Sequence, residues 1–126
     1  RIEAATKHDS QLFYGTILTW LARAQLANGE IDKADRAFRD ALKALKNKRP
    51  DEKEARAFAL TEYARLLSNM NNSQEVMYME KGKVYLLEAL PLWKELGDNP
   101  AENDCAKILQ RLNKRLGIAK LTKGIP

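Results

Sequence analysis

The chain contains a helical hairpin pattern whose first half recurs further along, and this recurrence is the strongest constraint on the fold. Residues 18–29 read LTWLARAQLANG and residues 60–71 read LTEYARLLSNMN, with Leu, Thr, Ala and Arg at the same offsets. The two segments start 42 positions apart. A period of this length is typical of proteins built from stacked helical hairpins. We therefore expect an all-α fold that forms a short solenoid.

The spacing of apolar residues predicts five helices. Apolar side chains recur three and four positions apart along most of the chain, which places them on one face of a helix. Gly29 and Pro50 end the first two predicted helices, because Gly tolerates the left-handed conformation and Pro disrupts a helix. We expect one domain over residues 1–126, made of a hairpin at 11–46, a second hairpin at 51–96, a covering helix at 101–116 and a tail at 117–126.

Each predicted helix has an apolar face that we expect to point into the core. In the first helix this face is Phe13, Tyr14, Ile17, Leu18, Leu21, Ala24 and Leu26, with Asp9 or Ser10 as the N-cap. In the second helix it is Ile31, Ala34, Ala37, Phe38, Ala41, Leu42 and Leu45. After an Asn-rich turn at 69–73, a helix over 74–96 carries Val76, Met79, Val84, Leu87, Leu90 and Trp93. Gly117 is predicted to end the fifth helix.

Composition and charge narrow the class of protein. Ala, Leu, Lys, Glu and Arg predominate, which favours helices, and the apolar runs are far shorter than the ~20 residues that span a bilayer. The formal net charge is +5. From Cys105 to Pro126 there are six basic residues and no acidic one. Such asymmetry indicates either an acidic partner or a solvated helix face, and both interpretations stay open.

The residues that usually carry out catalysis are scarce. The single histidine, His8, and the single cysteine, Cys105, lie far apart in sequence without a third group to orient them. No Cys/His cluster has the spacing of metal ligands, and no Gly-rich phosphate loop is present. We therefore predict a protein that is not an enzyme and that needs no cofactor or metal. A lone cysteine leaves the compartment open and favours the cytoplasm only slightly.

The first hairpin resembles the tetratricopeptide repeat (TPR). The positions that carry the resemblance are Leu18, Leu21, Ala22, Gly29, Ala34, Phe38 and Ala41, and in the second hairpin Leu60, Tyr63, Ala64, Leu67, Gly82, Leu86 and Ala89. The 42-residue period resembles the kinesin-light-chain type of these repeats. The resemblance implies a right-handed α-solenoid of two hairpins and a capping helix. It also implies a scaffold or adaptor that binds a peptide or another protein in its concave groove.

The resemblance also implies which side chains line that groove. They are Thr16, Thr19 and Arg23 from the first hairpin, Phe58, Thr61, Arg65 and Asn69 from the second, and Lys107, Arg111 and Arg115 from the covering helix. In this alignment Arg23, Arg65 and Arg111 fall in one column. Because guanidinium groups bind carboxylates and phosphates through a planar fork of donors, the expected partner is a protein segment, an acidic one in particular.

Two alternatives to groove binding remain open. The basic C-terminal helix could bind nucleic acid or another acidic surface, which would show steep salt dependence. The open ends of a short solenoid could instead stack on further copies of the chain and form a homo-oligomer. No membrane partner is expected.

Overall fold

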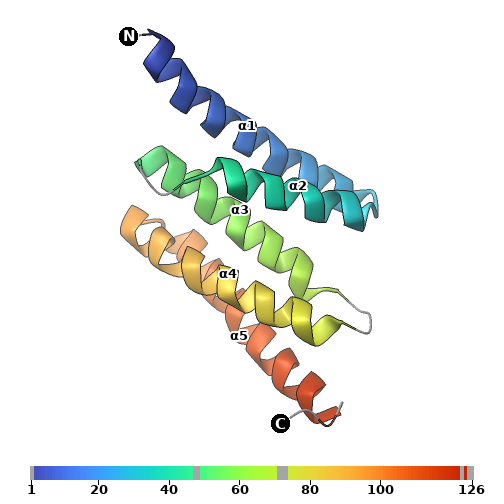
Figure 1. The fold of residues 1–126 in the computed structure, drawn as a ribbon. Helices are drawn as coiled ribbons and strands as arrows, with labels where there is room; N and C mark the ends of the chain where they lie inside the picture. The colour runs from blue at the N-terminus through green and yellow to red at the C-terminus, as the bar shows by residue number, and fades with distance from the viewer. Residues whose placement is uncertain (1, 47–48, 71–73, 123, 125–126) are drawn as a thin grey trace. The chain divides into compact units, whose positions relative to one another are not determined.

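The computed structural model is all-helical across the residues it describes, which are 2–46, 49–70, 74–122 and 124, with side chains from residue 9 onward. These ranges contain no strand, which confirms the predicted all-α class. The helices are α1 (Ile2–Ala27), α2 (Ile31–Ala44), α3 (Pro50–Ser68), α4 (Glu75–Leu96) and α5 (Asn99–Thr122) (Figure 1). None of these helices has a stretch long and apolar enough to cross a membrane. Residues 71–73 of the predicted turn lie outside the described ranges.

The chain divides into two compact units, residues 1–59 and residues 60–126, and the boundary falls within α3. In the first unit α1 packs against α2 as an antiparallel hairpin (Figure 1). The turn between them uses Gly29, whose φ of 77° is the left-handed conformation expected at this position. Burial of Ala34, Ala37, Phe38 and Ala41 confirms the predicted inward face of α2.

The α1 helix faces α2 with its small residues. Gly15, Thr19 and Ala22 are buried, at a spacing that puts them on one side of the helix. A Cβ atom built on Gly15 would lie 2.5 Å from Cγ of Leu45, so only glycine permits this approach. Leu45 is fully buried and packs with Ala41 and Ala59.

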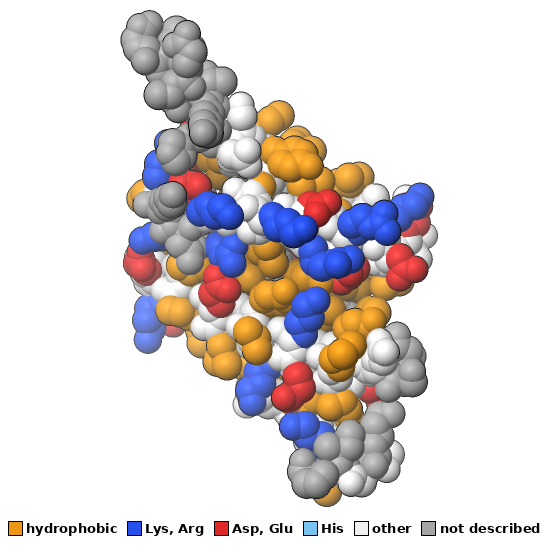
Figure 2. All heavy atoms as spheres, viewed as in Figure 1, with side chains coloured by type: hydrophobic (Ala, Val, Ile, Leu, Met, Phe, Trp, Pro, Cys, Tyr) orange, Lys and Arg blue, Asp and Glu red, His pale blue; other side chains and the backbone are white. Residues whose placement is uncertain are grey.

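The predicted inward face of the first helix is confirmed for Leu18, which is partly buried against Ala41, Leu45 and Ala59, but it is wrong for most of its other large members. Phe13, Tyr14, Ile17 and Leu21 are exposed large hydrophobic residues, and Ala24 is exposed as well (Figure 2 shows hydrophobic side chains over α1). The reason is that α1 carries two apolar faces, and the close contact at Gly15 selects the face that holds Gly15, Leu18 and Ala22. The helix also begins at Ile2, so Asp9 and Ser10 lie inside it and do not cap it.

In the second unit, α4 and α5 pack side by side and the C-terminal half of α3 completes the core (Figure 1). Gly82 permits a close contact, because a Cβ atom there would lie 3.5 Å from the Ala64 carbonyl oxygen. The Trp93 indole donates a hydrogen bond of 3.0 Å to the hydroxyl of Thr61. Met79, Leu112 and Leu116 form a buried cluster.

Two further predictions for this unit are wrong. Val84 and Leu87 are exposed on α4, because the packed face is set by Gly82, Leu86 and Ala89, which are buried. The fifth helix does not end at Gly117 but continues to Thr122, so most of the predicted tail is helical. Ala119 is buried beyond Gly117, which gives the continued helix a contact with the core.

Candidate functional site

The groove residues predicted in the first unit have different surroundings. Thr19 is 1% exposed, and its hydroxyl donates to the Gly15 carbonyl at 2.9 Å. Thr16 donates to the Leu12 carbonyl at 2.7 Å and lies beside a shallow surface hollow. The Arg23 guanidinium lies over two rings, 4.7 Å from the centroid of Trp20 and 5.5 Å from that of Phe58. A cation over an aromatic face is attracted by the ring quadrupole, so Trp20 and Phe58 position Arg23.

Exposure on a groove wall was wrongly expected for both threonines. Thr61 is 4% exposed and accepts the hydrogen bond from Trp93, so, like Thr19, it belongs to the core. A short β-branched residue fits where helices approach closely, and its hydroxyl finds a partner nearby. The recurrence of Thr at the 42-residue period therefore reflects helix packing.

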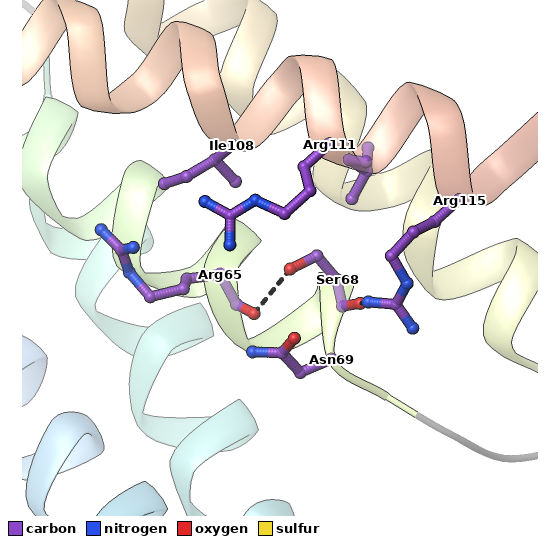
Figure 3. Close-up of a pocket in the computed structure, with 7 residues that line it drawn as sticks. Arg65, Ser68, Asn69, Ile108, Arg111 and Arg115 are labelled. Atoms are coloured by element: carbon purple, nitrogen blue, oxygen red, sulfur yellow. Dashed lines mark hydrogen bonds between the residues drawn. The ribbon is translucent and has the colours of Figure 1, made fainter.

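Besides the buried Thr61, five of the predicted positions lie on or directly after two neighbouring helices of the second unit, and four of these five surround one cavity. Arg65 comes from the last turn of α3, Asn69 directly follows that helix, and Arg111 and Arg115 come from α5 (Figure 3). The cavity has a volume of about 40 Å³, and Ser68, Ile108 and Leu112 complete its lining. The fifth position, Lys107, lies one helical turn before Arg111. Lys107, Arg111 and Lys114 are exposed and border a broader hollow next to Gln110.

Arg65 is held in place by two carboxylates. Its Nη2 lies 2.8 Å from Oδ2 of Asp104 and 3.2 Å from Oε2 of Glu62. Burial alone would lower the pKa of Arg65, but the hydrogen bonds and charges of Asp104 and Glu62 raise that pKa above its ordinary value. Arg65 is therefore fixed in position, and its charge is largely balanced by these neighbours.

The charges of the other two arginines are not balanced in this way. Arg115 donates through Nη1 to the backbone carbonyl of Ser68, the last residue of α3 (Figure 3). A carbonyl is neutral, so this bond orients the guanidinium group and satisfies the helix end without cancelling the charge. Arg111 makes no hydrogen bond or ion pair with any residue that the structure describes. Its guanidinium lies between Arg65 and Ser68 in Figure 3.

Cys105, the only cysteine in the sequence and therefore a candidate nucleophile, is part of the core. Cys105 is fully buried, and its Sγ lies 3.7 Å from the Leu86 carbonyl oxygen. Burial raises the pKa of the Cys105 thiol, which disfavours the reactive thiolate. Within the described ranges no group of His, Cys, Asp and Glu side chains could hold a metal ion.

Comparisons with protein-family models, with curated proteins and with solved structures give no significant match. The fold and the site of this chain are therefore the basis for describing its class. It is an all-α protein whose second unit carries a cavity surrounded by arginines from α3 and α5.

Sequence reasoning missed several residues that shape this site. It did not identify Asp104 as the partner that ties Arg65 in place, or Ser68 as the acceptor for Arg115. The four-residue spacing of Arg111 and Arg115 was a usable signal, because it places both on one side of a helix. The repeat alignment, which puts Arg65 and Arg111 in one column, was a signal that relates α3 to α5, but it did not indicate the contacts of Asp104 and Ser68.

Proposed function

We propose that this chain is a non-enzymatic interaction module that binds an acidic segment of another protein. We further propose that its hairpins stack in the manner of TPR repeats. Three features support TPR-like stacking: the 42-residue period, the antiparallel α1–α2 hairpin and the TPR-like pattern of small residues. The arginines around the cavity support the binding of an acidic segment.

The observation that carries this proposal is the pair of uncompensated guanidinium groups at the cavity. Arg111 and Arg115 come from successive turns of α5 and have no carboxylate partner within the described ranges. Lys107 and Lys114 extend the same positive surface along the helix. A carboxylate entering the cavity would meet the Arg115 guanidinium, which the Ser68 carbonyl orients, and the Arg111 guanidinium, whose donors are not used by described residues. Each hydrogen bond to a charged group would contribute roughly 1.5–3 kcal/mol before the cost of ordering the bound segment.

The test is a titration of the purified chain with a fluorescent oligoglutamate peptide, compared with a single-stranded oligonucleotide. Arg111→Ala should weaken peptide binding by about tenfold, which corresponds to ~1.4 kcal/mol. The matched control is Arg36→Ala, because Arg36 is exposed on α2 and makes no hydrogen bond or ion pair with described residues. Tighter binding of the oligonucleotide, lost equally on substitution of Lys107, Arg111 or Lys114, would favour the nucleic-acid alternative instead.

A second candidate function, self-association, is favoured by the exposed apolar face of α1. Phe13, Tyr14, Ile17, Trp20 and Leu21 are all 45–68% exposed on three turns of one helix. The three aromatic side chains alone present on the order of 300 Å² at this exposure. A standard interface buries about 800 Å² per partner, so the same face on two copies would support weak dimerisation.

Self-association is tested by sedimentation velocity over a range of protein concentrations. A dimer formed through this face should be lost in Ile17→Glu and kept in Leu121→Glu, because Leu121 is an equally apolar and even more exposed residue on α5. A sedimentation coefficient that stays at the monomer value up to millimolar protein would remove this candidate.

A further inference from the structure

We propose that the cavity between α3 and α5 binds a phosphate monoester, presented as a phosphoserine or phosphothreonine side chain of a partner protein. This inference rests on the proposed function and specifies its ligand. Three observations carry it: the size of the cavity, the balance of charge around it and the type of donors that line it.

The size of the cavity selects a small ligand. A volume of about 40 Å³ is available. A single water molecule needs roughly 10–15 Å³ measured in this way, so the cavity holds about three water-sized positions. This number matches the three terminal oxygens of one phosphate monoester. The rest of the partner would lie on the surrounding surface.

The balance of charge favours a doubly charged ligand. Arg65 is matched by Glu62 and Asp104, while the charges of Arg111 and Arg115 are not matched by any described carboxylate. A phosphate monoester carries a charge of about −1.5 to −2 at pH 7, and a glutamate side chain carries −1. Two uncompensated cations at one small cavity are therefore balanced by a phosphate group and only half balanced by a carboxylate.

The donors around the cavity have the geometry for phosphate. Each guanidinium group has five N–H donors in a planar fork. Arg115 uses one of its donor groups on the Ser68 carbonyl and keeps the others, while Arg111 uses none on described residues. Asn69 is exposed at the same cavity and adds a side-chain amide. Phosphate oxygens accept several hydrogen bonds at once, so they can engage both arginines.

The experiment compares three peptides of one sequence that carry serine, phosphoserine or glutamate at the central position, flanked by glutamates. Binding to the full chain is measured by fluorescence anisotropy, with inorganic phosphate as a competitor. The phosphoserine peptide should bind about tenfold more tightly than the glutamate peptide, because it forms more charge-assisted hydrogen bonds. Arg111→Gln should remove this preference, and Arg111→Lys should restore it only in part because lysine lacks the fork. Arg36→Gln should leave the preference unchanged.

The outcomes separate this inference from the proposed function. Equal affinity for the phosphoserine and glutamate peptides would overturn the phosphate assignment while leaving acidic-segment binding intact. Failure of all three peptides to bind would overturn both. Inorganic phosphate that binds as tightly as the phosphopeptide would show that free phosphate is the ligand. The assignment of the phosphate group to a side chain of a partner protein would then be wrong. Circular dichroism of the Arg111 variants checks that they remain folded, and Arg111 is suited to this because it is exposed.

Discussion

Phe13 and Phe38 are two phenylalanines of one unit with opposite surroundings. Phe38 is fully buried on the inner face of α2, and Phe13 is 68% exposed on α1. Both occupy positions with helical apolar spacing, yet only Phe38 loses its contact with water on folding. The two residues should therefore contribute very differently to stability.

Substitution of each phenylalanine by alanine tests this difference. Phe38→Ala should reduce the free energy of unfolding by about 3–5 kcal/mol, because it removes a buried ring and leaves a cavity. Phe13→Ala should change it by less than about 0.5 kcal/mol, as surface substitutions usually do. Urea denaturation followed by circular dichroism measures both. Similar losses for the two variants would mean that the α1 face assigned here is wrong.

At the level of the helix, small residues determine how closely neighbouring elements approach. Gly15 lies inside α1, where glycine lowers helix stability, and its presence is explained by the contact with Leu45. Gly117 also lies inside a helix, α5, but a Cβ atom there would meet nothing within 4 Å. The same residue type thus serves packing in one helix and has no packing role in the other.

Alanine substitutions at these glycines should have opposite signs. Gly117→Ala should stabilise the protein by up to about 1 kcal/mol, because alanine has the higher helix propensity. Gly15→Ala should destabilise it by about 1–3 kcal/mol, because the added methyl group overlaps a fully buried leucine and overpacks the core. Thermal or urea unfolding of the two variants measures the difference. Stabilisation by both substitutions would rule out the close contact between α1 and Leu45.

On the scale of the whole molecule, the net charge of +5 and the basic cavity should make the affinity for an acidic ligand depend on the salt concentration. The guanidinium groups of Arg111 and Arg115 are at or near the surface, where dissolved ions screen them. The exposed face of α1 is apolar, and salt screening does not weaken apolar contacts. The two proposed kinds of association should therefore respond differently to salt.

Raising the NaCl concentration from about 0.1 M to about 1 M shortens the Debye length from ~10 Å to ~3 Å. The affinity for the oligoglutamate peptide should fall by at least about tenfold over this range. Any dimer formed through α1 should persist in the same series, as measured by sedimentation. Peptide affinity that is independent of salt would contradict binding through the arginine cavity.

The sequence by itself determined the all-helical class, the left-handed turn at Gly29, the inner face of α2 and the concentration of positive charge after Cys105. These features depend on helix propensity and on the spacing of residues that are close together in the sequence. Tertiary structure decided which of two apolar faces α1 buries, because that choice depends on the fit of Gly15 against Leu45. It also decided that Thr19 and Thr61 are core residues and that α5 continues past Gly117. The pairing of Arg65 with Asp104 joins residues 39 positions apart, and only the packing of α5 beside α3 brings such groups together around one cavity.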